Sequence, residues 1–296
     1  MQQTKGNILG LLTILLWSSL ALFTVNAGNI PAFLLLSISF LVASLIGLLL
    51  LKKQKRKLKD LLNIPYKVYI IGVVGLFGYH FFYFLAIKNA PAVEANLINY
   101  LWPLLIVLFS AFLPNEKLKW FHILGTLLAL SGAFLLVLKD GSLEFESKYL
   151  LGYSFALIAA FLWASYSVIS KTLKHIPTFA VTGFCIITAI LSFISHLIFE
   201  QTYIPTNLEF FSAIMLGLGP VGGAFYLWDF ALKNADIKIL GSLAYLIPLL
   251  STLLLVFMGI ADMTTTIIIA CVLIILGSLI SSKQYFTILK NLIFKS

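Results

Sequence analysis

The chain has 296 residues, of which 61% are hydrophobic and only 10% are charged, and its mean hydropathy is +1.04. Because about a quarter of the residues in a typical soluble domain are charged, this composition excludes a water-soluble enzyme. The two cysteines, Cys185 and Cys271, are too few for a disulfide scaffold or a four-cysteine metal site. The net charge of +9 is explained by the position of the basic residues and does not indicate a nucleic-acid partner.

Ten apolar runs follow one another along the chain. A helix needs roughly 20 apolar residues to cross a bilayer, and each run approaches that length. The sequence therefore predicts an all-α polytopic membrane protein with ten transmembrane helices, joined by linkers too short for a soluble domain. In chain order, the predicted cores are residues 8–25, 30–51, 68–85, 93–113, 120–138, 149–169, 179–199, 208–232, 237–258 and 264–280.

The basic residues concentrate in alternate connections between these runs. If the spans alternate and the N-terminus starts inside, 17 of the 20 Lys and Arg residues lie on one side, seven of them in the connection 52–67. Because cytoplasmic loops carry an excess of basic residues, we expect a multi-pass protein of a bacterial inner membrane with both termini in the cytoplasm. Residues 284–296 are predicted to form a short basic cytoplasmic tail along the membrane surface.

The two halves of the sequence repeat each other. The run 85–90 (Leu-Ala-Ile-Lys-Asn-Ala) recurs as 230–235 (Phe-Ala-Leu-Lys-Asn-Ala), an offset of 145 residues. At the same offset, 100–103 (Tyr-Leu-Trp-Pro) recurs as 245–248 (Tyr-Leu-Ile-Pro). The chain is therefore predicted to consist of two related units of five spans each.

The expected boundaries of these units are residues 1–139 and 149–283. Because five is an odd number, the second unit enters the membrane upside down relative to the first. Many secondary transporters build a central site near the bilayer midplane from such inverted repeats. Trp17 and Trp163 hold matching places near the start of each unit, so we expect them to form opposite walls of such a site.

Two motifs carry a resemblance to a known family. They are the run 78–83 (Gly-Tyr-His-Phe-Phe-Tyr) and the run 94–103, which ends in Asn-Tyr-Leu-Trp-Pro. With the five-plus-five layout, they resemble the EamA family of the drug/metabolite transporter superfamily, and within it the YddG-type exporters of aromatic amino acids. The resemblance implies a basket-shaped helix bundle around a substrate cavity. The lining residues that it implies are Trp17, Tyr79, His80, Tyr83, Tyr100, Trp102 and Trp163.

The fourth span carries a polar stripe. Asn96, Asn99, Tyr100 and Pro103 are spaced i, i+3, i+4 and i+7, which places them on one helix face. Two amides facing lipid would be costly, so the stripe is predicted to face the bundle interior or a wet cavity, where Asn96 and Asn99 could bind the polar end of a substrate. Pro103, and Pro248 at the matching place in the ninth span, are predicted helix breaks that free a carbonyl for a ligand or water.

Titratable residues inside the predicted spans have structural alternatives. Tyr79 and Tyr83 flank His80 on the third span, where three polar rings converge, although tyrosines can also form an interfacial belt. His80 is either a proton relay or a hydrogen-bonded core residue, and the second is favoured because no carboxylate lies at its depth. Asp229 and Lys233, at i and i+4, are interpreted as a structural ion pair.

One glycine pattern resembles a nucleotide-binding motif but lacks the structural context that such a motif needs. Residues 217–222 spell the Gly-x-Gly-x-x-Gly dinucleotide fingerprint, but they lie in an apolar span with no preceding strand. Close helix packing through Gly219 and Gly223 is the preferred interpretation. The sequence offers no metal-spaced ligands, no cofactor motif and no paired membrane carboxylates, so an intramembrane enzyme has no chemistry to use.

The predicted function is export of amino acids, aromatic ones above all, or of similar neutral or zwitterionic metabolites by alternating access. The expected partners are an amino acid-like small molecule and the lipid bilayer, with the protein as a monomer and no nucleic acid. One alternative is a broad-specificity proton-coupled drug or metabolite exporter. Another is a non-transporting membrane receptor or assembly protein, which is disfavoured because it would not need inverted repeats.

Overall fold

The structure, a computed structural model, describes residues 2–114, 116–138, 146–259 and 262–282. Every regular element in these ranges is a helix. Within them, nine helical segments are long and apolar enough to cross a membrane, and Thr265–Ser281 is a shorter apolar helix. The all-α polytopic fold predicted from the sequence is confirmed. The predicted tail, residues 284–296, lies outside the described residues.

The first half of the chain makes five crossings, most of them built from more than one helix. Their elements are α1 (Gln2–Ser18) with α2 (Leu20–Asn26); α3 (Ala32–Lys53); α4 (Tyr66–Val73), a π-helical turn (Val74–Gly78) and α5 (Tyr79–Asn89); α6 (Ala92–Asn99) with α7 (Trp102–Phe109); and α8 (Trp120–Leu138). The described residues also contain three short 3-10 helices, at Leu58–Asn63, Ser110–Phe112 and Ser147–Tyr149.

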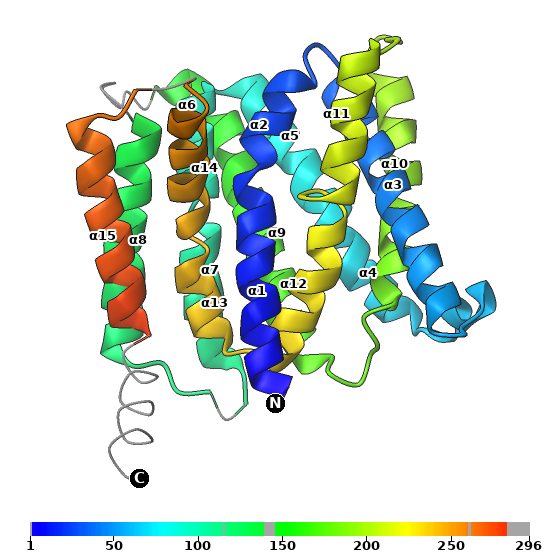
Figure 1. The fold of residues 1–296 in the computed structure, drawn as a ribbon, viewed down its shortest axis with the longest axis horizontal. Coiled ribbons are helices and arrows are strands. Elements are labelled where there is room, and N and C mark those ends of the chain that lie inside the picture. Colours follow the sequence, from blue (N-terminus) through cyan, green and yellow to red (C-terminus); the bar gives the residue numbers. More distant parts are fainter. Residues whose placement is uncertain (1, 115, 139–145, 260–261, 283–296) are drawn as a thin grey trace.

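The second half repeats this order of five crossings. Its elements are α9 (Leu150–Thr172); α10 (Ala180–Phe199); α11 (Asn207–Leu218) with α12 (Gly223–Asn234); α13 (Ile237–Leu243) with α14 (Leu246–Phe257); and α15 (Thr265–Ser281). The first crossing starts at the face that holds the N-terminus, whereas α9 starts at the opposite face (Figure 1). The two halves therefore cross in opposite directions, as an odd number of spans in each half requires.

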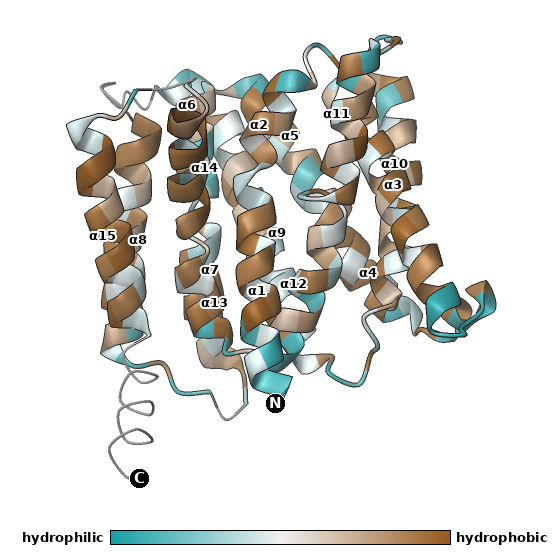
Figure 2. Cartoon of the chain, viewed as in Figure 1, coloured by the Kyte–Doolittle hydropathy of each residue, from teal (hydrophilic) through white to brown (hydrophobic). Residues whose placement is uncertain are grey.

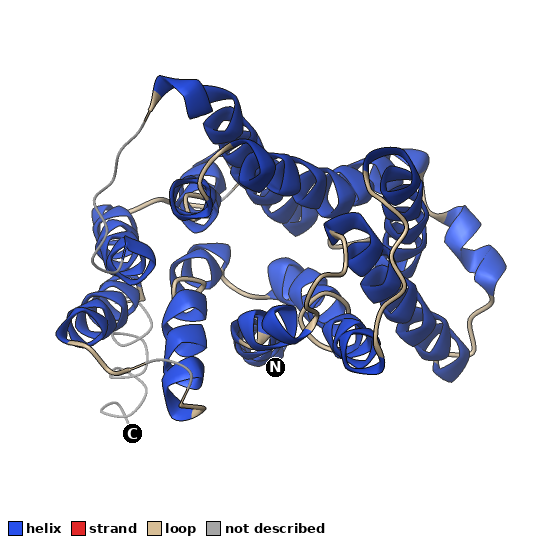
Figure 3. Ribbon diagram, turned by 90° about the horizontal axis from the view of Figure 1, so that it is seen from above, coloured by secondary structure: helices blue, strands red, loops and turns tan. Residues whose placement is uncertain are grey.

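Helices of one half pack on helices of the other half. In the described part of the chain, the most extensive contacts between the halves join α8 with α15, α3 with α10, α5 with α9, α1 with α12, and α3 with α11. The pair α8 and α15 forms one edge of the molecule, and α3 and α10 lie at the other (Figure 1). Seen from above, most helices are viewed nearly end-on, so the crossings run roughly parallel (Figure 3). The pairing of first with eighth and third with sixth crossings follows from a pseudo-two-fold relation between the halves.

The outer surface of the bundle matches a lipid environment. Hydrophobic residues cover the middle of the helices, and hydrophilic residues gather at the two ends (Figure 2). Large apolar side chains such as Leu49, Leu151 and Ile198 are more than half exposed. In water such an apolar surface would promote aggregation. In a bilayer it is the surface that faces the lipid chains.

Several crossings are interrupted, and two of the interruptions repeat. The π-helical turn Val74–Gly78 corresponds, at an offset of 145, to residues 219–223, where α11 ends and α12 begins. The turn at Tyr100 and Leu101, between α6 and α7, corresponds to the turn between α13 and α14. Broken helices of this kind are tolerated in membranes where neighbouring elements satisfy the freed backbone groups. The interruptions therefore belong to the repeat and not to one half.

The predicted role of the glycines around residue 220 needs correction. Gly219 is not a close-packing glycine, because a Cβ there would lie 3.3 Å from its nearest neighbour, the carbonyl oxygen of Met215 in its own helix. It lies instead in the irregular segment between α11 and α12. The close contact is made by Gly217, whose Cβ would lie 2.6 Å from the carbonyl oxygen of Ser39 on α3. The dinucleotide interpretation has no strand to support it in the described residues.

The pair α8 and α15 makes the closest backbone approach. A Cβ on Gly125 would lie 2.4 Å from the carbonyl oxygen of Gly277. In the same way, a Cβ on Gly277 would lie 2.5 Å from the carbonyl oxygen of Gly125. Such distances leave no room for any side chain. Small residues at membrane helix contacts permit this approach, and dispersion between the closely packed helices stabilises it.

Candidate functional site

Four of the five tryptophans meet in the middle of the bundle. Trp17 of α1 lies with its ring centroid 5.8 Å from Trp163 of α9, 6.1 Å from Trp102 of α7 and 4.9 Å from Trp228 of α12. Phe225 closes the group, 5.7 Å from Trp163. We call these five residues the tryptophan cluster. It draws on both halves of the chain, so any movement of one half against the other must rearrange it.

The repeat-related tryptophans touch each other. The sequence led us to expect Trp17 and Trp163 on opposite walls of a cavity, but their rings pack edge-to-face at an interplanar angle of 70°. Trp163 is only 3% exposed, and Trp17 is half-buried. The expectation of opposite walls is wrong for this conformation, because the two residues lie close enough to the pseudo-two-fold axis for their rings to touch.

Sequence reasoning missed Trp228 and Phe225, although a signal existed. Subtracting the repeat offset of 145 from these positions gives Tyr83 and His80, which the family resemblance had already singled out. Trp228 is fully buried, and its Nε1 donates to Oγ of Ser167 at 3.3 Å. Applying the offset to every candidate residue would have found both.

The predicted aromatic residues of the third crossing stack beside the cluster. Tyr79 and Tyr83 lie one turn apart on α5, with their rings stacked at 5.9 Å and 8°. Tyr79 also contacts Trp163, at 5.4 Å between centroids. Both tyrosines retain partial solvent accessibility although they lie among helices of both halves. This arrangement does not match an interfacial belt, which would place the rings on the outer surface.

The two asparagines of the polar stripe have different partners. Asn99 is buried and donates through Nδ2 to the hydroxyl of Tyr79 at 3.2 Å, whereas its Oδ1 accepts no hydrogen bond from the described residues. Asn96 is half-buried and accepts a hydrogen bond from the hydroxyl of Tyr83. The third and fourth crossings are thus tied by two amide–phenol contacts. Asn99 keeps an acceptor for a further donor.

His80 lies among rings. Its Nδ1 is 2.7 Å from the carbonyl oxygen of Leu76, and its ring lies 5.7 Å from Phe40 and 6.2 Å from Phe225. Among the described residues, no carboxylate forms an ion pair with it. This environment fits the interpretation of His80 as a hydrogen-bonded core residue.

The break in the fourth crossing is filled by the other half of the chain. The hydroxyl of Tyr245 donates to the carbonyl oxygen of Tyr100 at 3.1 Å and accepts from the amide of Leu104 at 3.2 Å. It therefore stands between two groups that an unbroken helix would join directly. Pro103 and Pro248 are both buried next to these breaks. Tyr245 occupies the carbonyl of Tyr100, whereas the carbonyl that Pro103 leaves without a helical donor is that of Asn99, four residues earlier, so the expectation of a carbonyl freed for a ligand or water stays a prediction.

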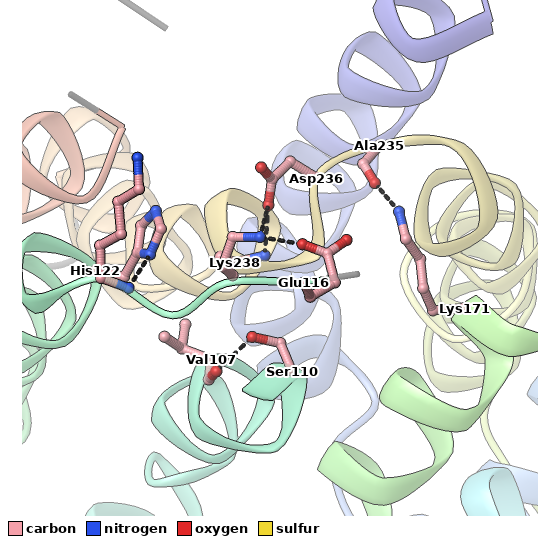
Figure 4. Close-up of polar contacts among 9 residues, drawn as sticks. Val107, Ser110, Glu116, His122, Lys171, Ala235, Asp236 and Lys238 are labelled. Carbon is pink, nitrogen blue, oxygen red and sulfur yellow. Dashed lines mark hydrogen bonds and ion pairs between the residues drawn. The ribbon is translucent and has the colours of Figure 1, made fainter. Parts of the chain in front are cut away.

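A polar network joins the helix ends on the face that holds the N-terminus. Lys238, at the start of α13, forms an ion pair with Glu116 from the first half and lies 3.5 Å from Asp236 (Figure 4). Lys171, at the end of α9, donates to the carbonyl oxygen of Ala235 (Figure 4). The ion pair of Glu116 with Lys238 connects the two halves, so it has to break if they separate at this face.

Two carboxylates connect the halves at the opposite face. Glu209 accepts from the backbone amide of Asn29 at 3.0 Å and from the hydroxyl of Tyr203, and this hydrogen bond raises the pKa of Tyr203. Glu200 accepts from the backbone amides of Phe33 and Leu34 in the first turn of α3. Both faces therefore carry polar links between the halves, and the tryptophan cluster lies between them.

The centre of the bundle presents aromatic rings and side-chain amide groups. Rings from both halves offer faces and edges, and Asn99 offers an acceptor, while the charged pairs described above lie at the two ends of the bundle. In the described part of the chain, no three His, Cys, Asp or Glu residues approach closely enough to hold a metal ion. Such a site can hold a flat apolar group by ring contacts and a polar group by hydrogen bonds.

A family model matches this chain twice. The EamA-like transporter family matches residues 4–138 and again residues 150–283. The two matches divide the chain near the point where the second set of five crossings begins.

Individual proteins are similar over nearly the whole chain. The aromatic amino acid exporter YddG of Ancylobacter novellus is 44% identical over 283 residues, covering 95% of this chain and 98% of its own. The protein of the same name from Salmonella typhimurium is 26% identical, covering 95% and 97%. A solved crystal structure that is 42% identical superposes with a TM-score of 0.91, over 96% of this chain and 99% of that one.

Proposed function

The chain belongs to the EamA-like transporter family, and we propose that its substrates are aromatic amino acids, which it exports. It is a multi-pass membrane transporter and not an enzyme. The observation that carries the proposal is the tryptophan cluster with Tyr79 and Tyr83 beside it, a set of rings at the centre of the bundle to which both halves contribute. The relatives named as aromatic amino acid exporters support the same substrate class.

The chemistry of the site limits the substrate. Stacked and edge-to-face contacts favour a planar side chain and tolerate differences among phenyl, phenol and indole groups. Asn99 has an acceptor oxygen suited to the ammonium group of the amino acid. A phosphate or polyanion would need an arginine or lysine at the centre to neutralise it, so such anions are disfavoured.

The mechanism that we propose is alternating access of the two halves around this centre. Export requires the face with the N-terminus, joined by Glu116 and Lys238, to open and load substrate. The opposite face, joined through Glu200 and Glu209, then opens to release it. Each face closes with polar contacts between the halves, which supports a cycle in which one set forms as the other breaks. The protein acts as a monomer in this proposal, because both halves of the site lie in one chain.

Counterflow in proteoliposomes tests the proposed function. Vesicles loaded with unlabelled phenylalanine are expected to accumulate labelled phenylalanine, tyrosine and tryptophan saturably, and leucine or alanine much less. Protein-free vesicles give the background. If a folded protein, verified by its elution as a single species, exchanges none of these amino acids, the proposed function is wrong. Equal exchange of aromatic and aliphatic substrates would refute the proposed selectivity alone.

The proposed orientation places both termini in the cytoplasm of a bacterium whose inner membrane holds the protein. A single cysteine at Gln54, which is exposed at the end of α3, is then expected to react with an impermeant maleimide only from the cytoplasmic side. The reason is that the connection 52–67 carries seven basic residues, which the cell retains inside. If the cysteine at this position is labelled in intact spheroplasts, the protein has the opposite orientation and the assignment of the two faces must be exchanged.

Transport is expected to proceed without a proton gradient. His80 is packed against rings and bonded to a backbone carbonyl, and none of the described carboxylates forms an ion pair with it that could take up a proton. The His80→Gln variant, which keeps a hydrogen-bonding side chain, should therefore retain downhill exchange with the same pH dependence as the parent. The measurement is uptake after an imposed pH step. Accumulation driven by that step in the parent, and its loss in the variant, would establish proton coupling instead.

A further inference from the structure

The connection between α3 and α4 is a basic segment with a defined conformation. Residues 52–67, which we call the basic connector, contain seven basic residues and one acid, Asp60, so positive charge is in large excess. All seven basic residues are exposed, and in the described part of the chain none of them forms an ion pair. Their charges are therefore available to a partner outside the chain.

One side of the basic connector is fixed to the bundle. Leu61 and Ile64 are buried, and the hydroxyl of Tyr69 on α4 donates to the carbonyl oxygen of Leu61 at 2.8 Å. The guanidinium of Arg56 lies 5.8 Å from the ring centroid of Phe179, at the start of α10. The connector is thus held against helices of both halves, and its remaining side chains form a surface of fixed position.

The other side of the basic connector presents leucines. Leu62 is 85% exposed and Leu58 is 61% exposed, both in the short 3-10 helix between α3 and α4. This segment lies beside the end of α3, at the outer edge of the molecule, and not beneath the bundle (Figure 1). In a membrane, that place is the interface between lipid and water. Exposed leucines interleaved with lysines are typical of segments that lie in this interface.

The charge of the connector selects among lipids. Lys57 and Lys59 flank Leu58, so their ammonium groups can reach the level of the lipid phosphates while the leucine enters the acyl-chain boundary. Clusters of basic residues next to a membrane helix attract anionic headgroups, and a zwitterionic headgroup offers no net charge to match them. An acidic protein would have to displace lipid from the two leucines, so a lipid partner is favoured.

We propose that the basic connector is a binding surface for anionic phospholipids. Leu58 and Leu62 enter the boundary of the acyl chains, and Lys55, Lys57 and Lys59 contact the headgroup phosphates. The contact attaches the joined ends of α3 and α4 to the membrane surface. It uses none of the residues of the candidate substrate site, so the inference goes beyond the proposed function and is independent of the substrate.

Fluorescence quenching in vesicles tests this contact. In full-length protein with Cys185→Ala and Cys271→Ala, a bimane dye is attached to Leu62→Cys. The vesicles are phosphatidylcholine with the same minor fraction of brominated phosphatidylglycerol, which is anionic, or of brominated phosphatidylcholine. The anionic lipid is expected to quench more strongly, since each basic residue near an anionic surface strengthens the attraction about five-fold. Raising the salt from about 0.01 M to 1 M shortens the Debye length from about 30 Å to 3 Å and should reduce the difference.

Two variants with the same loss of charge separate the connector from the rest of the surface. Replacing Lys55, Lys57 and Lys59 together by glutamine should abolish the difference between the two lipids. The control variant replaces three exposed lysines in other connections of the same face and should retain the difference. These three are Lys117, Lys119 and Lys174. Because all six lysines are exposed, both variants are expected to fold like the parent.

A second measurement uses the chain with its native cysteines. Phosphatidylglycerol added to the detergent-purified protein should raise the melting temperature of the parent and of the control variant more than phosphatidylcholine does, because a ligand of the folded state stabilises it. The connector variant should lose this advantage.

The outcomes decide the inference without reference to transport. Equal quenching of the parent by the two lipids refutes it, and so does a preference that persists in the connector variant. A preference that falls equally in both variants shows attraction by net charge alone and refutes it as well. If neither lipid quenches the dye, Leu62 lies away from the bilayer and the inference is wrong.

Discussion

Replacing Trp163 by alanine is expected to reduce transport of aromatic amino acids more than transport of aliphatic ones. Trp163 contacts Tyr79 at 5.4 Å and two other tryptophans of the cluster, so its loss opens the centre of the site. Each lost aromatic contact to substrate is worth about 0.5–1.5 kcal/mol beyond area burial, or a factor of about 2–12 in selectivity. Because Trp163 is buried, the truncation should also lower the free energy of unfolding by about 3–5 kcal/mol.

Two further variants separate recognition from stability. Trp17 is half-buried, so Trp17→Ala should change the ratio of aromatic to aliphatic transport with a smaller loss of stability. Trp120, at the start of α8, is 65% exposed and remote from the cluster, so Trp120→Ala should leave the ratio unchanged. The measurement is the ratio of transport efficiencies at matched amounts of folded protein. An unchanged ratio in both cluster variants would remove these tryptophans from the substrate site.

The second large effect is expected at the contact of α8 with α15. An added methyl group in Gly277→Ala would lie 2.5 Å from the backbone nitrogen of Ala129 and from the carbonyl oxygen of Gly125. Backbone atoms cannot move aside by changing rotamer, so the helices must separate. We expect a loss of about 1–3 kcal/mol in the free energy of unfolding, measured as a fall in the melting temperature of the purified protein.

Gly78 serves as a comparison, because alanine at this position is not expected to lower the free energy of unfolding. The nearest neighbour of a Cβ on Gly78, at the end of the π-helical turn, lies at an ordinary distance of 3.4 Å. Alanine also favours the helical state by about 1 kcal/mol over glycine. Gly78→Ala should therefore be neutral or stabilising, and Gly277→Ala destabilising. Equal effects of the two substitutions would show that the close approach of α8 and α15 has no energetic importance.

The crossings could be predicted from the sequence because the bilayer sets both their length and their composition. The fifth predicted run, residues 120–138, coincides with α8, and the seventh, 179–199, begins one residue before α10. The interruption at Ser19 was not predicted: Ser18 and Ser19 stand at that point of the run 8–25, but a serine hydroxyl can bond a carbonyl of its own helix without breaking it, so the pair alone does not decide. Within a uniformly apolar segment, helix breaks depend on contacts with neighbouring helices, which hydropathy does not report.

The candidate site was predictable in its residue types but not in its arrangement. The spacing of Asn96 and Asn99 indicates a shared face, and both contact the tyrosines of α5 as part of that face. Spacing alone could not reveal that Asn96 is occupied by Tyr83 while Asn99 keeps an acceptor. It could not reveal the contact of Trp17 with Trp163 either, because symmetry fixes that two residues are equivalent and not how far they lie from the axis.

The hydroxyl of Tyr245, from the ninth crossing, fills the break in the fourth crossing, and the repeat relation suggests what fills the matching break when the two halves exchange conformations. Tyr245 is fully buried and bridges Tyr100 and Leu104, whereas its repeat counterpart, Tyr100, is half-buried and bridges no such pair among the residues that the structure describes. Exchange of the two halves' conformations would reverse these roles. Tyr100 would then insert between Tyr245 and Leu249, the positions 145 residues further on. In such an exchange one tyrosine would withdraw as the other entered, so each of the two conformations would keep one bridge, and the two could lie close in energy although the sequence halves differ.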